Sequence, residues 1–244
     1  MANILDVHGL GTALEFGIPG IGGSDVAVLS FEALGADQSV RLMPEASGAI
    51  SEWVLGMDLY LPSQPGTWTG LLQTGTGDAD VFLRDNGDGT AGIGISSVYS
   101  GSFAFDAWVR VVISVSVEGG GTVLRKYIDG VNVGTQMLGA TDRWAIDPEL
   151  GLRLFTDNDG ETSRGYVSSI FFMSEPPEVA VLEATLAAAP TASAAGFFPV
   201  SPAEGAFEVG FAGETVDLRY GTASVALEGS DYQTPVAIGD STIA

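Results

Sequence analysis

The chain has 244 residues, of which 31 are acidic and nine are basic, so its formal net charge at pH 7 is -22. A surface this acidic repels phosphate backbones and anionic lipid headgroups, which argues against nucleic-acid binding and against membrane insertion. There is no cysteine and a single histidine, His8, so disulfides are excluded and a zinc site is nearly excluded. The composition favours Ca²⁺, which binds carboxylate oxygen; a solvated acidic surface is the alternative.

The chain reads as many short strands joined by turns, because glycine and Asp-Gly pairs are frequent along it. The expected strands are 13–16, 25–34, 39–44, 51–62, 70–75, 81–83 and 92–96. In the strand expected over 51–62, every second residue from Trp53 onward is a large apolar one, and both faces carry apolar residues. This pattern predicts a central strand with Trp53, Leu55, Met57, Leu59 and Leu61 on one face. Asp85–Gly89 is expected to be a hairpin turn, and 98–107 is expected to be a loop.

The stretch from Trp108 to Phe172 carries the strongest strand signal. It begins with WVRVVISVSV, in which β-branched residues alternate, and Asp129-Gly130 then predicts a two-residue hairpin turn. LGLRLFTDNDGETSRGYVSSIFFM reads as strand, acidic loop and strand. Two prolines end the last strand, and 178–188 is expected to form a short helix.

These elements predict an all-β fold: a two-sheet antiparallel jelly-roll sandwich, with a short helix near the end and a β-containing C-terminal extension. We expect the sandwich over 1–187 and a linker of small residues and proline over 188–204. The extension, 205–244, is too short for a robust second domain. It is either the start of a following domain or a set of strands docked on the sandwich.

Four pieces of the chain resemble, in their order, the laminin-G-like and concanavalin-A-like jelly rolls of the lectin and glucanase type. The pieces are GLLQTGTGDADVFLRDNGDGTAGIGIS, AWVRVVISVSV, YIDGVNVGTQ and FTDNDGETSRGYVSSIFFMSEPPEVAVL. The resemblance extends from about Ala13 to Leu186. It implies two antiparallel sheets packed face to face. It also implies a module that binds sugars or protein, or an accessory domain of a secreted bacterial protein such as a phosphoesterase.

The acidic loop Asp157–Glu161 is the main candidate for a metal site. Its three carboxylates would repel one another, and a divalent cation would remove that penalty. We expect Asp157 and Asp159 to hold Ca²⁺ together with Asp78 and Asp80 from a second loop. The resemblance supports this expectation, because such modules often hold Ca²⁺ between loops. The alternative is a pair of solvated turns, and the turn at 85–89 is a second, weaker candidate.

Aromatic side chains in expected loops are candidates for stacking on sugar rings, with packing inside the protein as the alternative for each. They are Tyr99, Trp68, Trp144 and Phe103. Arg125, Lys126 and Tyr127 form a basic group that could bind a carboxylate ligand or form salt bridges across strands.

Catalytic motifs are absent from the sequence. The E-x-D-x-x-E strand of laminarinase-type relatives is missing, as are a nucleophile elbow, a Walker loop and a dinucleotide fingerprint. A catalytic triad could use only His8. We therefore expect no enzyme activity within this chain.

The sequence thus predicts a non-catalytic, Ca²⁺-stabilised binding module of an extracellular bacterial protein that recognises carbohydrate or a partner domain. No Sec signal is visible at the N-terminus, since the first basic residue is Arg41, and an acidic, cysteine-free chain suits type I secretion. One alternative is an accessory domain of a larger secreted phosphoesterase or glycosidase whose catalytic domain lies beyond Ala244. Another is a purely structural or adhesive unit.

Overall fold

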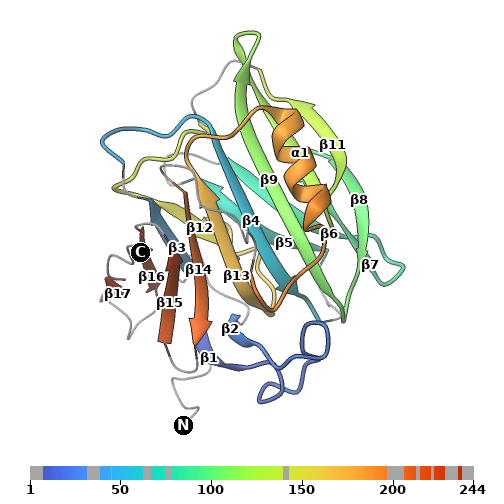
Figure 1. The fold of residues 1–244 in the computed structure, drawn as a ribbon. Coiled ribbons are helices and arrows are strands. Elements are labelled where there is room, and N and C mark those ends of the chain that lie inside the picture. The colour runs from blue at the N-terminus through green and yellow to red at the C-terminus, as the bar shows by residue number, and fades with distance from the viewer. Residues whose placement is uncertain are drawn as a thin grey trace.

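The protein folds into two antiparallel sheets packed face to face, with one short helix on the outside (Figure 1). The computed structural model describes residues 8–31, 39–44, 46–62, 67–74, 79–139, 143–196, 206–212, 215–220, 223–228 and 236–237. The predicted fold class is confirmed. Among the described residues, no helix is both long enough and apolar enough to cross a membrane.

The first sheet has nine strands, and its central path runs β1-β2-β13-β4-β9-β10-β11. These strands are β1 (His8–Thr12), β2 (Ala27–Phe31), β13 (Gly165–Met173), β4 (Trp53–Tyr60), β9 (Trp108–Glu118), β10 (Gly121–Ile128) and β11 (Val131–Met137). The remaining two are β14 (Ala206–Ala212), which pairs with β13, and β15 (Thr215–Tyr220), which pairs with β14.

The second sheet has eight strands in the order β17-β16-β3-β12-β5-β6-β7-β8. They are β17 (Val236–Ala237), β16 (Ala223–Glu228), β3 (Ser39–Pro44), β12 (Leu152–Leu154), β5 (Trp68–Thr74), β6 (Asp80–Asp85), β7 (Thr90–Ile95) and β8 (Val98–Ala104). The main hydrophobic core lies between the two sheets and takes alternate residues from both.

Strand β4 shows how the alternation builds the core. All five residues predicted for the inner face, from Trp53 to Leu61, belong to the main core cluster, and the last of them directly follows β4. The Trp53 indole N–H donates to the Trp144 carbonyl oxygen at 3.0 Å, which satisfies the one polar atom of this buried ring. The opposite face of β4 is also buried, since another layer of the protein covers it.

The hairpin turns follow the sequence closely. Asp129 and Gly130 both have positive φ, 45° and 77°, and they join Ile128 to its partner Val131. This is the conformation of a two-residue turn that favours Asp-Gly, so the predicted hairpin is confirmed. The turn at 85–89 likewise joins β6 to β7.

Two segments differ from the prediction. The first strand is His8–Thr12, and residues 13–17 form a turn instead of the expected strand. The aromatic-rich segment expected to be a loop forms β8, the edge strand of the eight-stranded sheet. Its glycine and serine residues hide the alternation, and pairing with β7 supplies the order that the local pattern lacks.

The outer face of the nine-stranded sheet is covered. The predicted helix is confirmed as α1 (Val179–Ala188), which lies in front of this sheet in Figure 1. Its Leu182 and Leu186 pack on Val54, Val112, Tyr127 and Phe171 of the sheet. Residues of the N-terminal segment 13–26 pack farther along the same face, against Tyr60 and Tyr166.

Strands of the C-terminal extension add to both sheets. Strand β14 pairs with β13 over Ser169–Met173, and β16 pairs with β3 over its whole length. Val209 and Phe211 of β14 enter the main core. The limits 1–187, 188–204 and 205–244 stay a prediction.

Candidate functional site

The outer face of the eight-stranded sheet carries the aromatic, polar and charged side chains of β5, β6 and β8. In β6, Val81 and Leu83 enter the core, so the alternation turns Asp80, Phe82 and Arg84 outward. Trp68 of β5 lies opposite Arg84 on one side of β6. Tyr99 of β8 lies on the other side of β6, two strands away across β7. Four strands that are consecutive in the chain therefore bring these residues to one surface.

Trp68, Phe82, Arg84 and Tyr99 form a compact group, hereafter the Trp68 cluster. The ring centroids of Trp68 and Tyr99 are 5.0 Å apart, and those of Trp68 and Phe82 are 6.4 Å apart. The guanidinium carbon of Arg84 lies 5.2 Å from the Trp68 centroid and 5.6 Å from the Tyr99 centroid. These are favourable cation–π distances, so both rings hold the guanidinium in place.

The acidic loop 155–163 borders the Trp68 cluster. The Gly70 amide donates to the Glu161 carbonyl oxygen at 2.6 Å, and the Thr69 hydroxyl donates to the Ser163 hydroxyl at 2.7 Å. A Cβ added to Gly70 would lie 3.0 Å from the Thr156 carbonyl carbon, so only glycine lets the loop approach this closely. The loop is therefore fixed against β5.

Asp157 organises the loop from inside. Only 2% of Asp157 is exposed, and its Oδ1 accepts hydrogen bonds from the amides of Asp159 at 3.1 Å and Glu161 at 2.8 Å. Partial burial, followed by the nearby Asp157 and Asp159 carboxylates, raises the pKa of Glu161. Burial also raises the pKa of Tyr99, with Arg84 opposing and Glu161 adding to the rise. The bond from the Gly70 amide to the Glu161 carbonyl oxygen places Glu161 beside the Trp68 cluster, since Gly70 pairs with Phe82.

The predicted calcium ligands are only partly brought together. Asp157 and Asp159 share the loop, while Asp80 starts β6 and is linked to it through Gln73, which pairs with Asp80 and donates to Asn158 at 2.9 Å. Asp78 lies outside the described residues. In the part of the chain that is described, no group of three or more acidic or histidine side chains is arranged to hold a metal ion. The calcium site stays a prediction.

The four predicted stacking residues separate into two pairs. Trp68 and Tyr99 meet on the outer face, although on strands and not in loops as expected. Trp144 and Phe103 are 3% and 6% exposed in the main core, so for these two candidates the alternative of packing inside the protein holds and stacking on a sugar does not.

The sequence analysis missed Phe82, Arg84 and Gln73 as site residues. A signal for the first two was present, since D-V-F-L-R places Asp80, Phe82 and Arg84 on the face opposite the apolar Val81 and Leu83. Gln73 had no comparable signal, because a bulge between Gly70 and Leu72 changes which residues of β5 face outward.

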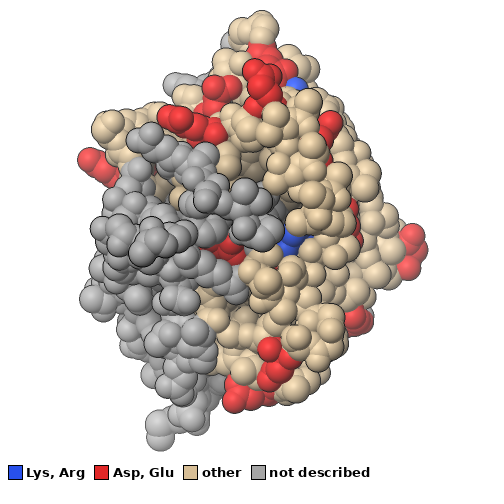
Figure 2. All heavy atoms as spheres, in the orientation of Figure 1, with Lys and Arg blue, Asp and Glu red and all other residues tan. Residues whose placement is uncertain are grey.

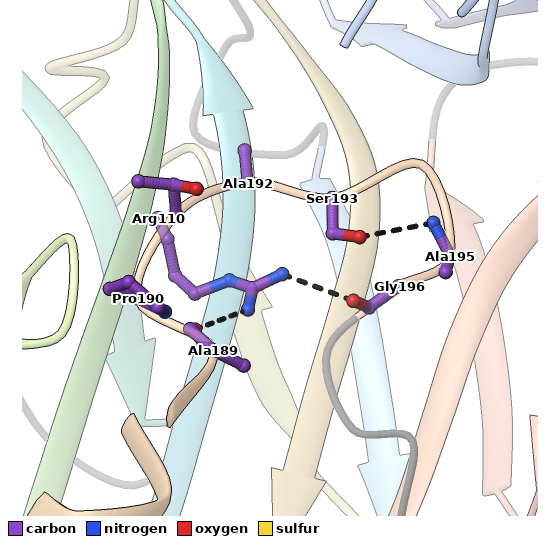
Figure 3. Close-up of a pocket in the computed structure, with 8 residues that line it drawn as sticks. Arg110, Ala189, Pro190, Ala192, Ser193, Ala195 and Gly196 are labelled. Carbon is purple, nitrogen blue, oxygen red and sulfur yellow. Dashed lines mark hydrogen bonds between the residues drawn. The ribbon is translucent and has the colours of Figure 1, made fainter. Parts of the chain in front are cut away.

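A pocket of about 280 Å³ lies on the covered face of the nine-stranded sheet, between Arg110 and the segment 189–196 (Figure 3). Arg110 and Asp58 are fully buried there and form a two-pronged ion pair with N–O distances of 2.7 and 2.8 Å. Arg110 also donates to the carbonyl oxygens of Ala189 at 2.7 Å and Gly196 at 3.1 Å.

The Ser193 amide donates to the same Asp58 carboxylate at 3.1 Å. Burial raises the pKa of Asp58, while Arg110 and the Ser193 amide oppose the rise. The bonds from Arg110 to Ala189 and Gly196 and from Ser193 to Asp58 fasten the segment to the sheet. Among the residues coloured in Figure 2, most over this side of the molecule are uncharged. The function of Arg110 is therefore structural.

No protein-family model matches the chain, and no curated protein matches its sequence. Among solved structures, a protein from Bacteroides ovatus described as carbohydrate binding is similar, with a TM-score of 0.54 and 14% identity; the match covers 83% of this chain and 60% of that one. The heptameric SAP-like pentraxin of Limulus polyphemus matches with a TM-score of 0.50 and 16% identity, over 82% of this chain and 94% of that one.

The chain thus spans about 60% of the length of the Bacteroides ovatus protein. At these identities the similarity concerns the fold alone, and it supports the concanavalin-like jelly roll that the sheets display. The finer resemblance to laminin-G-like domains stays a prediction.

Proposed function

We propose that the Trp68 cluster, on the outer face of the eight-stranded sheet, binds carbohydrate without catalysing a reaction. The observation that carries this proposal is the contact of two partly exposed rings, Trp68 and Tyr99, with the Arg84 guanidinium, beside the exposed Glu161. Sugar rings stack on aromatic faces, and their hydroxyls bond to charged and polar groups at the border. The carbohydrate binding described for the Bacteroides ovatus protein supports the same class of ligand.

A glycan array followed by calorimetry on the best ligand tests the proposal. We expect Trp68→Ala to weaken binding about tenfold or more, because stacking area and its hydrophobic contribution are lost. Trp108→Ala is the matched control, since Trp108 is also half-buried but lies on the nine-stranded sheet. Thermal melts of both variants report folding. The proposal fails if no glycan binds, or if Trp68→Ala binds as tightly as the unaltered protein.

Calcium at the acidic loop and an extracellular location belong to the same proposal. The three carboxylates that the loop brings together, Asp157, Asp159 and Glu161, support a bound cation, and the acidic, cysteine-free composition supports secretion. At Ca²⁺ 100-fold above Kd, binding to the folded state would add roughly 2.7 kcal/mol to stability. Asp157→Asn keeps an acceptor for the two loop amides but removes the charge, so it should abolish this gain.

Thermal melts in EDTA, Ca²⁺ and NaCl of matched ionic strength provide the measurement. If NaCl stabilises the protein as much as Ca²⁺ does, the loop holds no specific calcium ion.

A further inference from the structure

The protein has only nine cationic side chains against 31 acidic ones, so a cation without a carboxylate partner is unexpected. Arg110 pairs with Asp58, and Arg125 pairs with Glu118 at 2.8 Å. Arg84 and Arg153 differ from these two, because neither has a carboxylate within ion-pair distance among the described residues.

Both of these arginines lie on the outer face of the eight-stranded sheet. In β12, Leu152 and Leu154 enter the core, which turns Arg153 outward, and Arg153 lies in register with Gln73 of β5. Arg84 is exposed, and its guanidinium faces the Trp68 and Tyr99 rings. Stacking uses the faces of the guanidinium and leaves the N–H groups at its edge available to an anion.

The register gives the separation of the two arginines. Arg84 lies opposite Trp68 of β5, and Arg153 lies opposite Gln73 of β5. The Gln73 pair is four pairs farther along the β5–β6 ladder than the Trp68 pair. At roughly 3.3 Å per residue this is about 13 Å along the strands, and the two strands lie on opposite sides of β5, roughly 10 Å apart. This span exceeds one sugar ring, so a single monosaccharide cannot reach both side chains.

We propose that this face binds a polysaccharide carrying carboxylate or sulfate groups, with Arg84 and Arg153 each binding one anionic group of the same chain. The inference rests on the proposed function and names its ligand class. Guanidinium matches the geometry of both kinds of anionic group. Trp68 and Tyr99 stack a sugar ring next to Arg84, and the exposed Glu161 carboxylate beside them accepts hydrogen bonds from sugar hydroxyls.

Calorimetry with three polymers tests the proposal: a polyuronate, its carboxyl-reduced neutral form, and a neutral glucan bearing sulfate groups. Each polymer is measured with the unaltered protein, Arg84→Gln, Arg153→Gln and the control Arg125→Gln, whose arginine lies on the other sheet. We expect an anionic polymer to bind at least tenfold more tightly than the carboxyl-reduced polymer. Each variant at Arg84 or Arg153 should lose about tenfold to a hundredfold of that affinity, which is the loss of a hydrogen-bonded charge.

The carboxyl-reduced polymer should bind the arginine variants unchanged, and Arg125→Gln should bind all three polymers unchanged. Preference for the polyuronate assigns a carboxylate ligand, and preference for the sulfated glucan assigns a sulfate ligand. Equal affinity for charged and neutral polymers, with Trp68→Ala still weakening both, overturns this inference and leaves the proposed function standing. Failure of all three polymers and of every array glycan overturns both.

Discussion

The outer faces of the two sheets are both built from strands with alternating side chains, but one face is covered by other parts of the chain and the other carries exposed side chains. On the nine-stranded sheet, α1, the segment 189–196 and the segment 13–26 cover the face, and even its charged pair is fully buried. On the eight-stranded sheet, Arg84 is exposed and Trp68 and Tyr99 are half-exposed. A sheet face that another layer covers becomes part of the core, and a face left uncovered can bind a ligand.

Arg110 on the covered face and Arg84 on the open face illustrate this difference. The Arg110 guanidinium donates to Asp58, Ala189 and Gly196, so its removal leaves the Asp58 carboxylate buried without its ion-pair partner and takes a donor from two carbonyl groups. Arg84 rests on two rings, with solvent at its edge. The covered face should therefore control stability, and the open face should control binding.

The largest expected effect is at Arg110. Arg110→Met should lower the free energy of unfolding by about 3–5 kcal/mol, because it leaves the Asp58 charge buried and unpaired. Denaturant titration measures the loss. The double variant Arg110→Met with Asp58→Leu should recover part of it, since neither charge then remains in the interior. A loss below about 1 kcal/mol for the single variant would contradict the distinction between the two faces.

The next largest effect is at the helix that covers the face. Leu182 is 3% exposed against the sheet, so Leu182→Ala should cost about 2–5 kcal/mol through lost burial and the cavity left behind. Val181→Ala is the matched control, because Val181 is 54% exposed on the same helix and should change stability by about 0.5 kcal/mol or less. Equal losses in the two variants would mean that α1 does not close this face.

Lys126 adds a third case to the comparison, because it is a buried cation to which the described residues supply no carboxylate partner like that of Arg110. It is 1% exposed, and its amino group donates to the Val98 carbonyl oxygen at 3.1 Å. Its neighbours in register, Ile113 and Gly134, are uncharged. Burial lowers the pKa of Lys126.

The unfolded chain therefore binds more protons than the folded chain between the lowered pKa and the ordinary value of about 10.4, and stability rises with pH across that window. Lys126→Met should flatten this rise and add about 1–3 kcal/mol below the window, where the charged form is buried. Urea unfolding as a function of pH is the measurement. An unchanged pH profile in the variant would show that Lys126 stays charged at no cost.

The smallest expected effect is at Arg84. Arg84→Ala removes the cation–π contacts with Trp68 and Tyr99 and should cost about 0.5–1 kcal/mol, since the site is exposed. Differential scanning calorimetry of this variant beside Arg110→Met gives the comparison directly. If Arg84→Ala destabilises the fold as strongly as Arg110→Met does, the open face is as structural as the covered one.

The sequence by itself determined most of the strands, the hairpin turns and the helix, because these depend on local chemistry. Alternation placed Trp53, Leu55 and Met57 in the core, and Asp129-Gly130 supplied the backbone conformation that a tight hairpin needs. The same alternation contained the Asp80, Phe82 and Arg84 row, so half of the candidate site was readable from β6 alone.

Only the tertiary structure decided which face of each sheet is covered and which side chains meet. Alternation divides a strand into two faces but does not say what packs on either one. Asp58 and Arg110 are 52 residues apart in the sequence, and Thr69 and Ser163 are 94 apart. Trp68 and Trp144 both follow loop-like sequence, yet one reaches the open face and the other fills the core. Such outcomes depend on long-range packing, which brings together residues whose local sequences carry no sign of each other.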